Sequence, residues 1–278
     1  MTTSLIKYRG VTLPNPKKTL NNIPFNKESL IGWLGAEKVV ASEYGVDAIV
    51  DYNDETISYN TRATTNITRL LAEGSVKGFK VLNSAPISTP NVDSPYNIPS
   101  LAGYAGKSTI TYAMLLSVSA SQYAVGQRTV LSIVSKNAGG SVVPMTRIQF
   151  NSNTSMSVAS RHSSPDENTM LATINGIPAG FNVIFAELNY ADKYVRLSLN
   201  GGAMLTYAAY EGTSAGNSLP TDAVGVLFGS INNDGGTIEN TQFSGAIREL
   251  SVFDAKLSDS DIRELLDYLN ARRAYLNS

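Results

Sequence analysis

The side chains that could do chemistry are few in this chain of 278 residues. Its one histidine, His162, lies in the segment ASRHSSPDEN, where serines and a proline predict an exposed loop. Because the chain has no cysteine, that histidine alone cannot build the usual zinc site, although carboxylates could add ligands. Serine-histidine-aspartate catalysis would also depend on His162. A solvated loop histidine is the simpler interpretation.

Paired carboxylates, which glycoside hydrolysis requires, are not evident in the sequence. Asp51, Asp54 and Glu55 come closest, but they lie at the end of a predicted strand, without the alternating spacing that puts carboxylates on one strand face. Glu187 and Glu249 are lone carboxylates in predicted strands, where structural or solvent-facing roles are expected. We therefore predict that the chain is not an enzyme.

Oxygen-rich side chains gather in the segment NNDGG, residues 232–236. Calcium prefers such hard oxygen ligands, although a plain Asn/Gly turn explains the same residues. Two tyrosines upstream could stack on a sugar at this loop. The candidate site, for carbohydrate or for calcium, comprises Asn232, Asn233, Asp234, Tyr207 and Tyr210. Calcium is the only cofactor that these residues suggest.

Composition excludes several classes of partner. Lys and Arg number 22 and Asp and Glu 23, so the net charge of −1 offers no bulk attraction for nucleic acid or anionic lipid. No stretch approaches the roughly 18 apolar residues of a membrane span, and the N-terminus has no apolar signal segment. We expect synthesis in a cytosol, no nucleic-acid partner and no membrane insertion.

Many short apolar or alternating runs, separated by polar turns, predict a mostly β protein. The run TITYAMLLSVS is apolar enough for a strand that is buried on both faces. In YVRLSLNGG, alternation leads into Asn200-Gly201, a favoured two-residue hairpin turn. The segment 62–78 could contain a brief helical turn, and residues 84–100, with four prolines, predict a surface loop.

The end of the chain predicts a strand and a helix. In FSGAIRELSVFD, alternation breaks around Arg248–Leu250, which suggests a bulge. Ser258 is a suitable N-cap, with Asp259 and Asp261 in the first turn and Arg272–Arg273 near the other end of the helix. One helical stripe is apolar and should pack on the sheet: Ile262, Leu265, Leu266, Leu269 and Leu276.

Residues 1–28 contain three prolines and predict an extended arm, either a loose terminus or a docking segment for a neighbouring subunit. Residues 29–278 then form one domain.

The closing segment resembles the last strand and helix of concanavalin A-like (laminin-G-like) jelly-roll domains. The family's strand pattern and the following turn are matched by Phe243, Gly245, Ile247, Glu249, Leu250, Val252, Phe253, Asp254, Leu257 and Ser258. Near the front, LIGWLGAEKV resembles the family's opening strand, and IVDYND carries Tyr52 where the family usually has tryptophan. The resemblance spans residues 29–277. It implies an all-β, two-sheet antiparallel jelly-roll sandwich with a C-terminal α-helix, whose concave face or edge loops bind ligands.

Domains of this family occur in sugar-binding modules of secreted enzymes and in virion proteins of tailed bacteriophages. The absence of a signal segment and of cysteine favours the virion. We predict a non-enzymatic structural protein of a bacteriophage virion, a capsid decoration protein or a tail or fibre component, assembled in the host cytoplasm. Its expected partners are other virion proteins, further copies of the chain in a homo-oligomer such as a trimer, and host surface glycans. The alternative is a bacterial lectin-like carbohydrate-binding module.

Overall fold

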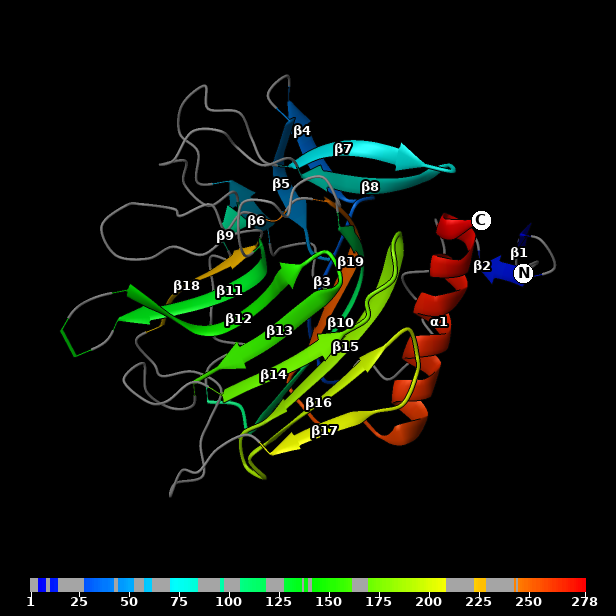
Figure 1. Ribbon diagram of the computed structural model, residues 1–278. Helices are drawn as coiled ribbons and strands as arrows, with labels where there is room; N and C mark the ends of the chain where they lie inside the picture. The colour runs from blue at the N-terminus through cyan, green and yellow to red at the C-terminus, as the bar shows by residue number, and fades with distance from the viewer. Residues whose placement is uncertain are drawn as a thin grey trace.

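A computed structural model describes the following residues of the chain: 5–8, 11–14, 28–42, 45–52, 58–61, 71–84, 96–97, 106–118, 128–136, 138–139, 142–161, 170–208, 223–228, 243 and 245–278. These residues form two large antiparallel sheets that pack face to face, with one helix against the outside of one sheet (Figure 1). The prediction of a mostly β sandwich closed by a C-terminal helix is confirmed.

The sheet that carries the helix is here called the eight-stranded sheet. Its order is β17 (Leu205–Ala208), β16 (Tyr194–Leu199), β15 (Phe181–Asn189), β10 (Thr109–Val118), β19 (Gly245–Phe253), β8 (Phe79–Ser84) and β7 (Leu71–Val76), and β3 (Leu30–Gly35) also pairs with β19. Residues 71–76 are thus a strand, and the suggestion of a helical turn was wrong there. They pair antiparallel with β8 from Leu71 opposite Ser84 to Val76 opposite Phe79.

The opposite sheet is here called the nine-stranded sheet. Its order is β14 (Met170–Asn175), β13 (Ser155–Ser160), β12 (Val142–Ser152), β11 (Arg128–Lys136), β18 (Ala223–Phe228), β9 (Tyr96–Asn97), β6 (Ser58–Thr61), β5 (Gly45–Val50) and β4 (Val39–Ser42). Strand β9 lies inside the proline-rich segment predicted as a loop. It is only two residues long because Pro95 and Pro99 flank it and cannot donate to a ladder. Within the predicted arm, β1 (Leu5–Tyr8) and β2 (Val11–Pro14) pair with each other.

Strands β10 and β15 are buried on both faces, as the apolar run in β10 predicted. In β10, Tyr112, Met114 and Leu116 enter the core between the two sheets. The alternating Ala113 and Leu115 enter a second core, between the eight-stranded sheet and the helix. A sheet that is covered on both sides needs apolar residues at consecutive positions, which explains why these strands show no polar face.

Helix α1 (Asp259–Asn277) begins where the sequence predicts. The Ser258 hydroxyl oxygen accepts a hydrogen bond from the backbone N–H of Asp261 at 3.1 Å, which satisfies one of the free amides of the first turn. The apolar stripe is buried in full, as expected: Ile262, Leu265, Leu266, Leu269 and Leu276. Arg272 and Arg273 do not lie in the last turn, so their expected interaction with the helix dipole is absent. They bind groups of the sheet instead.

The expected bulge in β19 occurs at Arg248. Leu115 of β10 lies opposite Glu249 and Leu116 lies opposite Ile247, so Arg248 has no partner in β10. Two consecutive polar residues can therefore face the helix side of the sheet. Nearby Gly245 has a φ of +155°, and a Cβ there would overlap the carbonyl oxygen of Ser117, so this position requires glycine.

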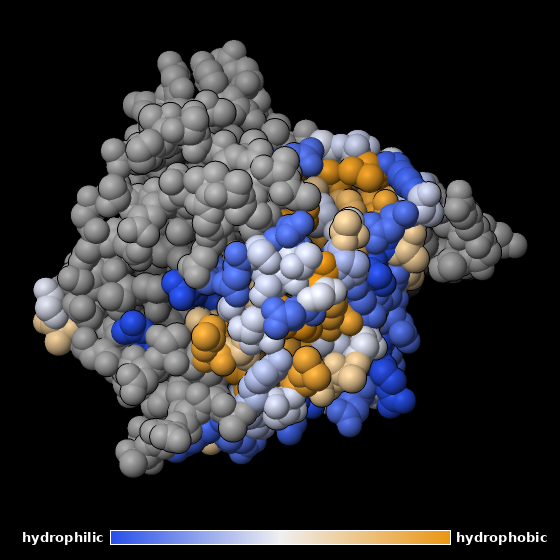
Figure 2. Space-filling model, viewed as in Figure 1, coloured by the Kyte–Doolittle hydropathy of each residue, from blue (hydrophilic) through white to orange (hydrophobic). Residues whose placement is uncertain are grey.

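The hairpin between β16 and β17 turns at Asn200 and Gly201, which have φ values of +56° and +73°. Two successive positive φ angles are those of the turn type that Asn-Gly favours, as predicted. Hydrophilic side chains cover the outer side of α1 on the right of Figure 2, and apolar ones show over the β7–β8 hairpin beside it. No helix among the described residues is long and apolar enough to cross a membrane.

Candidate functional site

The outward-facing side of the nine-stranded sheet is polar over four neighbouring strands. In β12, Ile148 and Phe150 belong to the core between the sheets, so the residues that alternate with them point outward. The same alternation holds for the outward residues of β11, β13 and β14. The name "polar face" denotes here Thr129, Ser132, Arg147, Gln149, Asn151, Ser157 and Thr173.

Two cross-strand pairs lie at the centre of the polar face: Thr129 opposite Gln149, and Ser132 opposite Arg147. Thr129 and Ser132 are 0% exposed and Gln149 is 2% exposed. Nevertheless, the two hydroxyls, Gln149 Oε1 and Arg147 Nε form no hydrogen bond with the described residues. Each buried unpaired group lowers the free energy of unfolding by about 1–3 kcal/mol, so four adjacent groups of this kind require an explanation. A bound molecule with its own hydroxyls would pair them.

The polar face continues to a more accessible rim. Gln149 Nε2 donates to Asn151 Oδ1 at 3.0 Å, and Asn151 Nδ2 donates to the Ser157 hydroxyl. The hydroxyls of Ser157 and Thr173 share a hydrogen bond of 3.2 Å. Arg147, Asn151 and Thr173 are partly exposed, so this rim is the accessible part of the polar face.

Of the residues predicted to bind sugar or calcium, the structure describes Tyr207. Its ring packs against the core between the sheets, and its hydroxyl donates to the carbonyl oxygen of Thr173 at 2.6 Å. Tyr207 thus links β17 to β14 across the open edge of the sandwich. Tyr210 and the loop residues Asn232, Asn233 and Asp234 lie outside the described residues, so the predicted site stays a prediction. His162 lies outside them as well.

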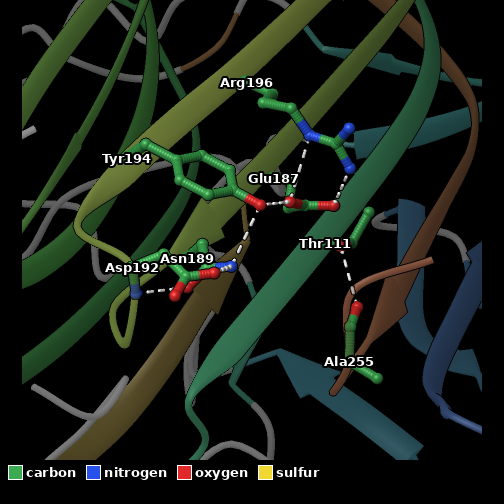
Figure 3. Close-up of polar contacts among 7 residues, drawn as sticks. All are labelled: Thr111, Glu187, Asn189, Asp192, Tyr194, Arg196 and Ala255. Atoms are coloured by element: carbon green, nitrogen blue, oxygen red, sulfur yellow. Dashed lines mark hydrogen bonds and ion pairs between the residues drawn. The ribbon is translucent and has the colours of Figure 1, made fainter. Parts of the chain in front are cut away.

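The lone strand carboxylate Glu187 is buried and paired on the helix side of the eight-stranded sheet. Figure 3 shows Glu187 of β15 with Arg196 and Tyr194 of β16 turned toward it. Arg196 Nη2 donates to Glu187 Oε2 at 2.6 Å, and the Tyr194 hydroxyl donates to Oε1 at 2.9 Å. Beside them, the Thr111 hydroxyl donates to the carbonyl oxygen of Ala255 at 3.0 Å. The hydrogen bond from Thr111 to Ala255 holds the segment before α1 against the sheet.

A second buried cluster surrounds the bulge residue Arg248. Its guanidinium makes a bidentate ion pair with Glu37 and lies over the ring of Phe79, 5.3 Å from the centroid. The Tyr52 hydroxyl donates to Glu37 and accepts from its backbone N–H. Burial raises the pKa of Glu37, but the charge and hydrogen bonds of Arg248, the hydrogen bond from Tyr52 and the charge of Arg272 together leave that pKa below its ordinary value. Burial and the Glu37 charge raise the pKa of Tyr52.

The other predicted strand carboxylates have structural partners too. Glu249 Oε2 accepts from Arg272 Nη1 of α1 at 3.2 Å. Asp51 Oδ2 accepts from the backbone N–H of Trp33 at 2.9 Å, which holds the two front segments together. Asp54 and Glu55 lie outside the described residues. No group of three or more metal-binding side chains occurs in the described part of the chain. This finding does not test calcium binding at the predicted loop, because that loop lies outside the described residues.

No protein-family model matches the chain, and no curated protein sequence matches it. Solved structures do match. A Trypanosoma rangeli sialidase in complex with 2-keto-3-deoxy-D-glycero-D-galacto-2,3-difluoro-nononic acid is 12% identical, with a TM-score of 0.55 over 88% of this chain and 34% of that one. Another Trypanosoma rangeli sialidase structure is 11% identical, with a TM-score of 0.54 over 96% and 36%. The carbohydrate-binding module CBM40 of Ruminococcus gnavus IT-sialidase, bound to α2,3-sialyllactose, is 16% identical, with a TM-score of 0.47 over 69% and 95%.

These matches concern the fold, and the chain spans about a third of the length of the Trypanosoma sialidases. They correct one expectation. The sequence predicted that the chain is not an enzyme, whereas the structures that it matches at TM-scores of 0.52 to 0.55 are of enzymes. The prediction rested on the single histidine, the absence of cysteine and the absence of paired carboxylates along the sequence. Pairing along the sequence is a poor guide here, because the fold joins Glu37 to Arg248 across 211 residues.

The polar face was missed by the sequence prediction, although a signal for it exists. In MTRIQFN, Arg147, Gln149 and Asn151 alternate with Ile148 and Phe150. This alternation predicts one polar strand face, but a solvated face gives the same pattern. Only the pairing with the neighbouring strands shows that these side chains lie beside further polar groups that are buried.

Proposed function

We propose that this chain is a carbohydrate-binding β-sandwich domain that holds its glycan on the polar face. The observation that carries the proposal is the pair of cross-strand contacts, Thr129–Gln149 and Ser132–Arg147, whose polar atoms are buried without partners. A sugar presents donors and acceptors around one ring, so it can satisfy several convergent groups at once. The matched sialidase structure contains a sugar acid, which makes glycans the first ligand class to test.

The finer topology and the biological setting belong to the same proposal. The closing strand and helix support a concanavalin A-like jelly roll, since Gly245 and the Ser258 cap lie where that resemblance places them. The comparisons give no support to a phage virion role. Localisation in a virion, with the homo-oligomer and virion partners, stays a prediction that mass spectrometry of purified particles would test. Absence from particles would eliminate it.

The test of glycan binding uses substitutions that separate binding from folding. Thr129→Val and Ser132→Ala each remove an unpaired hydroxyl. Because an unpaired buried group destabilises the fold, both variants should unfold at the same or a higher temperature. If these hydroxyls bind a glycan, each variant should bind it about 5-fold to 10-fold more weakly, since a hydrogen bond contributes about 1 kcal/mol.

The matched control is Thr146→Val, on the opposite face of the sheet in the neighbouring strand β12. The Thr146 hydroxyl shares a 2.9 Å hydrogen bond with the Ser160 hydroxyl. Its loss should lower stability and leave glycan affinity unchanged. The wild-type chain would first be screened on a glycan array, with hydrolysis of the same glycans followed in parallel. A blank array, or binding that survives both hydroxyl substitutions, would refute the proposal.

A further inference from the structure

Arg147 lacks the carboxylate partner that three other arginines of the described residues have. Arg196 pairs with Glu187 at 2.6 Å, Arg272 pairs with Glu249 at 3.2 Å, and Arg248 pairs with Glu37. Arg147 has no carboxylate partner within the described part of the chain, and its Nε is buried and unpaired. An uncompensated guanidinium in a partly dehydrated place is costly unless something anionic joins it.

A second cation increases that cost. The pKa of Arg147 is lowered first by burial and then by the positive charge of Arg161, which follows the neighbouring strand β13. Around Arg147, the side chains of Ser132, Gln149 and Thr129 offer groups that are unpaired within the described residues and suit neutral hydroxyls.

We infer that the glycan held on the polar face is acidic, and that its carboxylate binds Arg147. This inference rests on the proposed function, because it assigns the ligand class of the same site. A planar guanidinium matches a carboxylate with two parallel hydrogen bonds. The ring hydroxyls then pair with Ser132 and with Gln149 Oε1. A sulfate ester would offer the same charge, so the two anions have to be compared directly.

The experiment measures the affinity of the full chain for three matched trisaccharide or disaccharide probes: α2,3-sialyllactose, its carboxyl-reduced form, and sulfated lactose, with lactose as the neutral reference. We expect sialyllactose to bind at least about 10-fold more tightly than its reduced form, since a hydrogen bond to a charged group is stronger than one between neutral groups. The preference should shrink as salt rises. Tighter binding of sulfated lactose than of sialyllactose would overturn the assignment to a carboxylate.

Two variants test whether the carboxylate of the glycan binds Arg147. Arg147→Gln should abolish the preference for sialyllactose over its reduced form. Arg147→Lys should keep part of the preference, because an ammonium attracts the anion without the bidentate geometry. Arg263→Gln is the charge-matched control, since Arg263 is exposed on α1 and its side chain donates to the Asp259 carbonyl oxygen. It should retain the wild-type preference.

The outcomes distinguish this inference from the function on which it rests. Binding of neutral and acidic probes with equal affinity, or an unchanged preference in Arg147→Gln, would refute the acidic ligand and leave glycan binding intact. Failure of the wild-type chain to bind any probe or array glycan would refute both.

Discussion

The role of a charged side chain in this protein depends on the residue that it contacts rather than on its own type. Glu187 and Glu249 are isolated carboxylates in the sequence, yet each accepts from an arginine in a buried setting. Arg147 is an arginine of the same kind without such a partner. A buried ion pair is costly to break because the remaining charge is left without compensation.

Removal of Glu187 should therefore be strongly destabilising. Glu187→Ala leaves Arg196, whose side chain is 16% exposed, without its anion. We expect a loss of about 3 kcal/mol in the free energy of unfolding by urea, with a smaller loss for the double variant Glu187→Ala/Arg196→Met. Equal losses in the single and double variants would show that the charge is not the cause. Asp267→Asn, at an exposed position on α1, serves as the control.

At the scale of elements, the closing strand and helix combine two local signals with one long-range requirement. Ser258 caps the helix and the apolar stripe faces the sheet, and both follow from neighbouring positions in the sequence. The second core, by contrast, needs Phe181, Val183 and Phe185 of β15, about 80 residues earlier. The helix is thus stabilised mainly by burial and only to a smaller extent by its cap.

Two substitutions in this segment should lower the free energy of unfolding by different amounts. Leu265 is 0% exposed in the core between helix and sheet, so Leu265→Ala should lower the free energy of unfolding by about 2–5 kcal/mol. Ser258→Ala should cost about 1 kcal/mol. Glu264→Ala, at the neighbouring exposed position, should change it by less than about 0.5 kcal/mol. If Leu265→Ala costs no more than Ser258→Ala, the helix does not owe its stability to this packing.

At the scale of the whole molecule, the sandwich is joined at points far apart in the sequence. Tyr207 links the two sheets at one edge, and the Glu37–Arg248–Tyr52 cluster links β19 to the segment that follows β3. Such contacts couple the stability of the whole domain to the ionisation of a few side chains.

The domain should lose stability in acid partly through Glu37. Its pKa in the folded chain lies below the ordinary value of 4.5, so the unfolded chain takes up the proton first as the pH falls. The stabilisation is present in full above about pH 4.5 and declines as the pH drops toward the folded pKa. Urea unfolding measured from about pH 7 to about pH 3 should show this slope, and Glu37→Gln should reduce it.

Glu264→Gln provides the comparison for that measurement, since Glu264 is an exposed carboxylate on α1. It should keep the wild-type slope. A slope in Glu37→Gln as steep as that of the wild type would mean that other carboxylates account for the acid sensitivity.

The sequence by itself determined the features that depend on near neighbours: the strand periods, the Asn200-Gly201 turn, the bulge near Arg248, the Ser258 cap and the buried helical stripe. These follow from local backbone preference and from the alternation of apolar residues, which a single segment displays. The tertiary structure alone decided which polar residues meet. Alternation shows that Arg147 and Gln149 share a face, but it cannot show that Ser132 and Thr129 lie opposite them, or that Arg147 has no carboxylate partner among the described residues. Strand pairing sets those distances, and it depends on the register of chain segments that the sequence order does not relate.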